Sequence, residues 1–460
     1  MIKLLMVLLW LVFIVMTVSQ LFYLQYRDKQ ILGITFSKAH SMEEDVTRVV
    51  ASCRKVCLGI LFLSVGFSLI MLIPALQEYG EFIMLFLIIC NIFSNGFIIR
   101  YYQKKLLTIK KVNDWEYSRN NLITIDLNVS REKGKASISA FWVWLFFLLS
   151  FIPTVILLVN PKMRQTYPLA LSFIGPFSQL CASLVYYQLK NLPTKLPNIN
   201  PELRLIYAHK QERINSITGT LSALSMLIFW CLFNISILYT NSSIPIIAPV
   251  IILVVGLLGI AHWQQKKLRS LEDTFAGTIS DVNEELYEEE PKWKWGFYHN
   301  PKDPRILVPK RLSGMGWTFN TGHPVGRALS LAILLVLFFI LGVVFYGSGK
   351  DYQFTVKDSE LIIDAAMYDM TIDKDQIASV SIISTLPKGI RTNGYGGIRK
   401  SYGNFQINDY GPCKLYIYND LGKFIVLELT TTTPSYVIIN KKTLEDTEAL
   451  YFDINNWISK

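Results

Sequence analysis

The stretch "KWKWGFYHNPKDPR", residues 292–305, holds the densest group of side chains that could do chemistry in this 460-residue chain. His299, Asp303 and Arg305 lie close together in it, and His323 follows downstream. An imidazole, a carboxylate and a guanidinium that meet in one cleft can carry out general acid–base chemistry. A catalytic interpretation therefore requires these four side chains to converge in the folded protein.

The same stretch also fits a segment that lies on a membrane surface. Tryptophan and tyrosine rings suit the headgroup layer because each ring has one apolar and one wet side. Asn300-Pro301 and Asp303-Pro304 favour turns, since the helical region is disfavoured for a residue before proline. The basic side chains can face lipid phosphates. This interpretation explains every residue class, so we predict an interfacial loop formed by Trp293, Trp295, Tyr298, Asn300, Asp303, Arg305, Lys310, Arg311 and Trp317.

A second candidate site is the glycine-rich segment 388–402, "KGIRTNGYGGIRKSY". Glycines allow a backbone to approach an anion closely, and the basic side chains supply positive charge. The alternative is a mobile, solvated loop without a ligand. The predicted ligand residues are Lys388, Arg391, Tyr395, Arg399, Lys400 and Tyr402.

Several chemistries lack their usual sequence patterns. The chain has no P-loop, no H-E-x-x-H and no G-x-S-x-G, which disfavours nucleotide hydrolysis and the common proteolytic mechanisms. Cys53 and Cys57 have a spacing that could place two metal ligands on a helix, but no histidine or acid cluster completes a site. We therefore predict no metal, no cofactor and no enzymatic activity. Without a basic recognition motif, we predict no nucleic-acid partner.

The elements that must position these residues are apolar blocks long enough to cross ~30 Å of hydrocarbon. We predict about eight transmembrane helices, at residues 4–24, 56–76, 82–99, 139–159, 167–187, 217–239, 244–263 and 328–346. The blocks contain no acidic residue, which disfavours an ion-coupled transporter. Their polar exceptions either bond to neighbouring helices or line a path for an uncharged substrate: Asn91, Asn95, Gln179 and Asn234.

The basic residues predict the orientation. The segments after spans 1, 3, 5 and 7 hold 30 Lys and Arg residues, whereas the short links after spans 2, 4 and 6 hold 2. The positive-inside rule therefore places the long segments in the cytoplasm. The N-terminus and the C-terminal domain are then extracytoplasmic. Basic residues near the bilayer also make anionic lipid headgroups a predicted partner.

Residues 351–460 change from helical to strand patterning. Seven short alternating runs, from "YQFTV" to "YVII", precede one helix that begins near Thr443. Thr443 can cap that helix, and Leu450, Ile454, Trp457 and Ile458 follow at the spacing of one apolar face. We predict an all-β barrel closed by a C-terminal helix. The organisation is then a membrane region (1–290), an interfacial loop domain (291–326), span 8 (327–346) and a β domain (351–460).

Two resemblances add to this interpretation. The stretch from Trp295 to Pro324 resembles a small domain of unknown function that occurs in multi-pass membrane proteins, mainly of Gram-positive bacteria. The shared residues are Trp295, Gly296, Tyr298, Asn300, Pro301, Asp303, Pro304, Arg305, Val308, Lys310, Arg311, Gly314, Gly316, Trp317, Thr318, Asn320 and Pro324. The C-terminal strands, "LPKGIRTNGYGGIRKSYGNFQI" and "TTTTPSYVIIN", resemble the bacterial pleckstrin-homology-like fold. That fold does not by itself imply phosphoinositide binding, because the first hairpin here, "VKDSELI", is mostly acidic.

These observations predict an integral protein of the cell membrane. The first hypothesis is a non-enzymatic sensor, scaffold or immunity-type protein whose C-terminal domain binds a protein, peptide or other ligand. The second is a transporter or flippase of an uncharged or amphipathic substrate. The two differ in whether the four membrane amides line one path or make separate helix contacts.

Overall fold

A computed structural model describes residues 2–27, 29–115, 117, 134–159, 172–190, 201–239, 244–276, 290–294, 296–311, 316–365, 368–387, 389–397, 399–431 and 434–459. Trp295 and Lys388, two of the predicted site residues, lie outside these ranges.

Among the described residues, six helices are long and apolar enough to cross a membrane. They are α1 (Ile2–Tyr23), α3 (Glu44–Ser68), α4 (Gly80–Val112), α11 (Pro201–Tyr239), α12 (Ile244–Ala276) and α13 (Pro324–Gly349). The other two predicted spans coincide with shorter helices: α6 (Phe141–Leu149) with α7 (Ile152–Val159), and α10 (Ile174–Lys190). The chain is therefore an α-helical membrane protein, with membrane-spanning length in six described helices.

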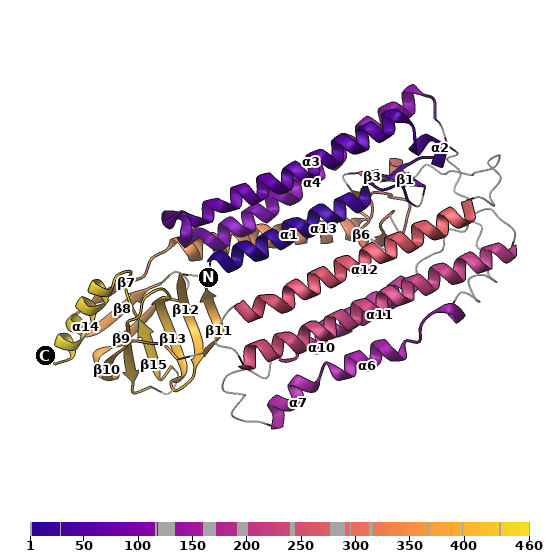
Figure 1. Ribbon diagram of the computed structural model, residues 1–460. Coiled ribbons are helices and arrows are strands. Elements are labelled where there is room, and N and C mark those ends of the chain that lie inside the picture. The colour runs from indigo at the N-terminus through magenta and orange to yellow at the C-terminus, as the bar shows by residue number, and fades with distance from the viewer. Residues whose placement is uncertain are drawn as a thin grey trace.

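The helices lie side by side in two groups (Figure 1). In one group, α1, α3 and α4 pack on one another and α13 packs on α4. In the other, α11 packs on α6, α10 and α12, while α1 contacts α12 and joins the groups. Exposed apolar side chains cover much of the helix surfaces, and α13 has no buried residue in its most apolar window. Such a surface is stable only against lipid tails or another apolar partner.

Short strands gather at one end of the helices (Figure 1). The link after α1 forms a hairpin of β1 (Gln30–Ile31) and β2 (Ile34–Thr35), followed by α2 (Lys38–Ser41). Before α13 the chain forms η4 (Glu290–Lys292) and two small hairpins, one of β3 (Trp293–Lys294) with β4 (Phe297–Tyr298) and one of β5 (Leu307–Pro309) with β6 (Trp317–Phe319). We call the described residues of 290–323 the small β unit.

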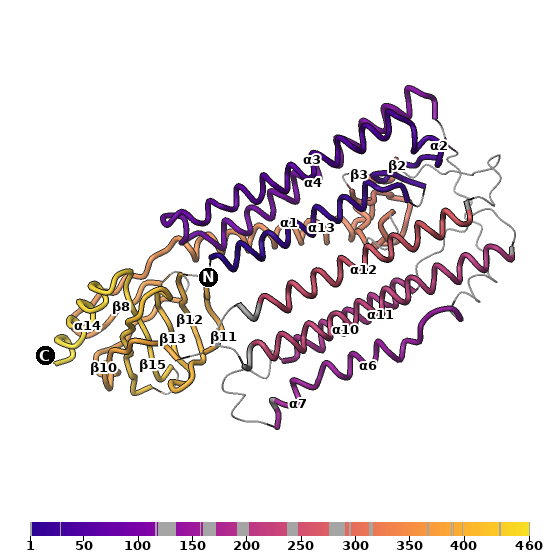
Figure 2. The backbone as a smooth tube through the Cα atoms, viewed as in Figure 1, coloured from indigo at the N-terminus to yellow at the C-terminus, as the bar shows by residue number. Residues whose placement is uncertain are grey.

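The C-terminal domain lies at the opposite end of the helices, the end at which α1 begins (Figure 2). Strands β7 (Gln353–Val356), β8 (Glu360–Asp364) and β9 (Met370–Asp373) form one antiparallel sheet. A six-stranded sheet has the order β10-β14-β15-β13-β12-β11. Its members are β10 (Ile377–Ile383), β11 (Gly389–Gly396), β12 (Lys400–Ile407), β13 (Gly411–Tyr418), β14 (Phe424–Leu429) and β15 (Tyr436–Ile439). Helix α14 (Leu444–Ser459) follows.

The seven strands predicted from alternation are present, and β9 and β11 are additional. The Thr443 hydroxyl accepts a hydrogen bond from the Asp446 amide at 3.0 Å, which confirms the predicted helix cap. Leu450 and Ile454 are buried in the domain core. The segment predicted as a loop over 388–402 is instead mostly a hairpin, because β11 and β12 pair from Gly389–Ile407 to Gly396–Ser401. Alternate side chains of this hairpin face the domain core. The many glycines made this alternation hard to recognise in the sequence.

Candidate functional site

The small β unit is built on two consecutive turns. The Asn300 side-chain oxygen accepts a hydrogen bond from the Lys302 amide at 3.1 Å, and Asp303 Oδ1 accepts one from the Arg305 amide at 3.0 Å. An Asx side chain that bonds two residues ahead mimics a backbone turn, and the proline between fixes φ for it. The sequence "NPKDPR" is thus a pair of Asx-Pro turns.

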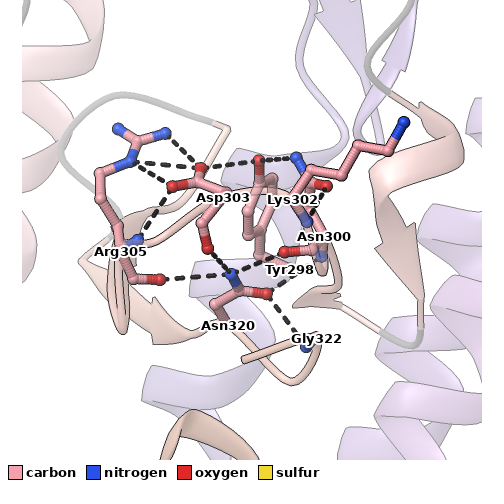
Figure 3. A network of polar contacts seen from close by, with 7 residues as sticks. All are labelled: Tyr298, Asn300, Lys302, Asp303, Arg305, Asn320 and Gly322. Carbon is pink, nitrogen blue, oxygen red and sulfur yellow. Dashed lines mark hydrogen bonds and ion pairs between the residues drawn. The ribbon is translucent and has the colours of Figure 1, made fainter. Parts of the chain in front are cut away.

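Asn320 holds the two turns together (Figure 3). Its side chain is fully buried; Nδ2 donates to the carbonyl oxygens of Asn300, Asp303 and Arg305 at 2.9, 3.0 and 3.2 Å. Its Oδ1 accepts from the amides of Asn300 and Gly322, both at 3.0 Å. A Cβ on Gly322 would lie 2.5 Å from the Asn300 carbonyl carbon, so only glycine allows this approach. One amide side chain therefore fixes the loop's shape.

Asp303 is held in a charge-assisted network (Figure 3). Its carboxylate pairs with the Arg305 guanidinium at 2.7 Å and accepts from the Tyr298 hydroxyl at 3.0 Å. Hydrogen bonds from Arg305 outweigh the opposing effect of burial and hold the pKa of Asp303 well below its usual range. Tyr298 is buried, and burial raises the pKa of its hydroxyl. This network stabilises a turn and leaves Asp303 ionised.

The groups required for the catalytic interpretation each have a different partner. His299 Nδ1 is hydrogen-bonded to the Thr321 hydroxyl at 3.1 Å. His323 Nδ1 accepts from the Val325 amide at 3.2 Å and so caps α13. Asp303 pairs with Arg305. Each group thus has a local structural role that explains its presence without catalysis.

Arg311 does not face lipid phosphates as expected. It is buried, and its guanidinium donates to the Gly33 carbonyl and, at 2.9 Å, to the Thr35 hydroxyl, while Gln30 Nε2 donates to the Arg311 carbonyl at 2.8 Å. The hairpin β1–β2 thus supplies one backbone carbonyl and one side-chain hydroxyl as acceptors for this guanidinium. Of the other predicted interfacial residues, Lys310 and Trp317 are exposed and Trp293 stacks edge-on against Tyr298.

Further buried polar residues around the small β unit were not predicted. Glu290 accepts hydrogen bonds from the Thr35 amide and, at 3.5 Å, from the Lys110 ammonium of α4. Arg27 donates to Gln265 of α12. These partners come from segments far apart in the chain, so no local spacing could indicate them. The Glu290 contacts attach the small β unit to α4 and to the hairpin β1–β2. The Arg27 contact attaches the segment just before that hairpin to α12.

At the opposite end, the C-terminal domain caps α13. The Lys400 ammonium donates to the carbonyl oxygens of Ser348 and Lys350 at 2.9 and 3.1 Å and pairs with Asp351 at 2.8 Å. The Lys400 side chain is 3% exposed. A cation at a helix C-terminus satisfies carbonyls that lack intrahelical partners and complements the helix dipole.

An ion-pair network extends from this cap to the link between α3 and α4. Lys442 pairs with Asp351 at 2.6 Å and with Glu78 at 3.4 Å. Glu78 lies in η2 (Pro74–Tyr79), where Arg399 also reaches it at 3.8 Å. Burial raises the pKa of Asp351, but hydrogen bonds from Lys400 and Lys442 outweigh it, so the net pKa is below its ordinary value. The C-terminal domain therefore contacts two membrane segments, η2 and α13.

Two tyrosines complete this contact. Tyr395 and Tyr402 stack with ring centroids 5.0 Å apart, and the Tyr395 hydroxyl bonds to the Ser348 hydroxyl at 3.0 Å. A Cβ on Gly347 would lie 2.6 Å from the Tyr402 hydroxyl and 3.0 Å from the Tyr395 ring. Burial raises the pKa of Tyr395 to about 12. We call Gly347, Ser348, Asp351, Tyr395, Lys400 and Tyr402 the joint.

The residues predicted to bind a ligand in segment 388–402 therefore fall into two sets. Tyr395, Arg399, Lys400 and Tyr402 face the ends of the membrane helices, whereas Arg391 is exposed. Lys400 is occupied by three oxygen acceptors of this chain. The positive charge of Lys400 is thus used for contact within the chain.

Two of the four membrane amides contact each other, because Asn95 Nδ2 donates to the Asn91 side-chain oxygen at 2.7 Å. Asn91 donates to Ser64 of α3 at 2.7 Å and Gln179 donates to the Ala223 carbonyl of α11 at 3.0 Å. Asn95 and Asn234 donate within their own helices. Helices α3 and α4, which hold the Asn91–Ser64 contact, belong to one group of the bundle. Helices α10 and α11, which hold the Gln179–Ala223 contact, belong to the other. A shared substrate path along these side chains has no support in this arrangement.

Comparison with known families agrees with the two domains just described. Residues 301–327 match a family of unknown function, DUF5808, and residues 352–445 match the bacterial PH domain. The chain carries a DUF5808 domain and a bacterial PH domain. The DUF5808 match begins at Pro301, within the first Asx-Pro turn, and includes the second turn, Asn320 and the first residues of α13. The PH match begins at Tyr352, directly after the joint residue Asp351. No curated protein and no solved structure matches this chain.

Proposed function

We propose that this chain is a non-enzymatic membrane sensor or scaffold in which α13 couples the PH domain to the DUF5808 domain. The observation that carries the proposal is that both ends of α13 are held by close contacts. At its start, Gly326 packs so closely on the Asn320 carbonyl that a Cβ would overlap it. At its end, Gly347 packs on Tyr402 and Lys400 caps the last carbonyls. A helix fixed at both ends moves as one body.

In this proposal the PH domain and the N-terminus are extracytoplasmic, and the DUF5808 domain is cytoplasmic. The distribution of 30 against 2 basic residues in alternating links supports that orientation. It assigns eight spans, with α6–α7 and α10 crossing alongside the six longer helices. It also treats the PH domain as a barrel closed by α14, whose Leu450 and Ile454 are buried in the core. A protein or peptide bound by the PH domain would then shift α13.

Cysteine labelling tests the orientation in intact cells. All six native cysteines are replaced, and single cysteines are placed at the exposed positions Asp375 of the PH domain and Lys302 of the DUF5808 domain. A membrane-impermeant maleimide should label the Asp375→Cys variant in intact cells and the Lys302→Cys variant only after permeabilisation. Labelling of both from outside, or the reverse pattern, would contradict the proposed orientation.

An immunity-type role is a special case of the same architecture, in which the ligand of the PH domain is a toxin. The transporter alternative rests on membrane amides that line one path. Asn91 and Gln179 instead contact different partners in different helix groups, which does not support such a path.

A further inference from the structure

The surface of α3 and α4 changes from apolar to basic towards the DUF5808 end. Further from that end, both helices expose large apolar side chains: Phe62, Leu63, Phe67, Ile92, Phe93 and Phe97. Towards the DUF5808 end the exposed positions become basic, with Arg54 and Lys55 on α3 and Lys104 and Lys105 on α4. Half-buried Arg100 lies between the two zones of α4.

The change occurs at the same level on both helices. The Ser52 and Tyr102 hydroxyls are hydrogen-bonded at 2.9 Å, so these two residues lie side by side. Lys55 on one helix and Lys105 on the other are each three residues away, which is ~4.5 Å along a helix axis. Since α3 and α4 run in opposite directions, the basic residues form one band around the Ser52–Tyr102 contact.

Lys105 lies over two tyrosine rings within this band. Its ammonium lies 4.7 Å from the centre of the Tyr101 ring and 5.6 Å from that of Tyr102. Tyr101 is exposed, and its ring has an apolar body with a polar tip. An aromatic ring beneath a lysine is the arrangement found at the headgroup level of a bilayer.

Acidic residues do not neutralise this band. In the described ranges Arg54, Lys55, Arg100, Lys104 and Lys105 form no ion pair, and no Asp or Glu lies within four residues of any of them. Two other cations at this end are paired with acidic residues: Arg48 with Glu44 and Lys38 with Asp273. Among the described residues, the band therefore carries five positive charges without an acidic partner.

We propose that this band on α3 and α4 binds the phosphate groups of anionic phospholipids. The tails of such a lipid cover the exposed phenylalanines, and its headgroup phosphate pairs with the adjacent cations. One phospholipid molecule can therefore contact both the apolar and the basic zone. The assignment to the cytoplasmic leaflet rests on the orientation in the proposed function. The band differs from the interfacial loop, in which Arg311 is buried and Arg305 is paired with Asp303.

Native mass spectrometry of the purified full-length protein tests the site directly. Phosphatidylglycerol and phosphatidylcholine are titrated into the wild type, a Lys104→Gln/Lys105→Gln variant and a control, Lys357→Gln/Lys374→Gln, on the PH domain. Because each cation near a lipid surface contributes about fivefold, the first variant should bind phosphatidylglycerol roughly twentyfold more weakly. The control should bind like the wild type, and inorganic phosphate should not displace the lipid.

Equal affinity of the first variant and the wild type for phosphatidylglycerol would overturn the site, as would equal affinity of the wild type for both lipids. Displacement by inorganic phosphate would assign the band to a free anion instead. These measurements use detergent-solubilised protein and do not depend on orientation. A Lys55→Cys variant labelled from outside intact cells would overturn the cytoplasmic leaflet and the proposed orientation together, whatever the lipid affinities.

Discussion

The Lys400 ammonium donates to the Ser348 carbonyl oxygen at 2.9 Å, although the two residues are 52 positions apart. This bond joins a strand of the PH domain to the last turn of α13. Because the lysine is almost fully buried, water cannot replace it without opening the domain contact.

Replacing Lys400 by Gln should loosen the joint. The substitution removes a charge that serves three acceptors, and hydrogen bonds to charged groups contribute about 1.5–3 kcal/mol. Hydrogen exchange of the full-length protein should become at least tenfold faster in the Lys400–Ile407 strand. Lys441→Gln is the control, since that ammonium makes no ion pair among the described residues. Equal exchange in both variants would remove Lys400 from the joint.

Replacing Asn320 by Asp should destabilise the DUF5808 domain. The substitution keeps the shape but removes the Nδ2 donor shared by three carbonyls and adds a charge beside them. Leaving buried groups unsatisfied costs about 1–3 kcal/mol. Exchange of residues 298–311 should rise at least fivefold, while Lys302→Ala, at an exposed position, should leave it unchanged.

Replacing Arg311 by Lys should separate the DUF5808 domain from the hairpin β1–β2. A lysine cannot reach the Gly33 carbonyl and the Thr35 hydroxyl as a fork. Backbone amides of residues 30–35 should exchange roughly tenfold faster. Lys310→Gln, next to it but exposed, serves as the control, and no difference between the two would show that Arg311 is dispensable.

Acid should weaken the joint. The pKa of Asp351 is below its ordinary value because of Lys400 and Lys442, so its stabilising effect is complete above the unfolded pKa of about 3.9. The effect is lost as pH falls further through the folded pKa. Thermal unfolding of the wild type should therefore depend more steeply on pH between about 4 and 2 than that of Asp351→Asn. Asp375→Asn should behave like the wild type.

Much of the fold could be predicted from the pattern of apolar and polar residues within single segments. Alternating runs predicted seven strands of the PH domain, and the Thr443 cap and the spacing of Leu450 and Ile454 predicted α14. The apolar blocks predicted the six long helices. In each case the signal lies in neighbouring residues that share one face or one turn.

Residue roles that depend on distant partners were not predictable in this way. Lys400 lies in a glycine-rich segment that resembles a loop, and its acceptors are on α13. Arg311 lies in a basic run that resembles a lipid contact, and its acceptors belong to a hairpin 276 or more residues away. A cation's sequence neighbours do not reveal whether a backbone carbonyl or a phosphate will be its partner.

The central claim, that α13 couples the two domains, is tested most directly by hydrogen exchange on three proteins in nanodiscs. These are the wild type, Gly347→Ala and Gly342→Ala; the last is the matched control because a Cβ there meets nothing within 4 Å. If α13 couples the domains, Gly347→Ala speeds exchange both in the Lys400–Ile407 strand and in residues 298–311 at the far end of the helix, while Gly342→Ala changes neither. Faster exchange in the strand with no change in residues 298–311 would contradict coupling through α13.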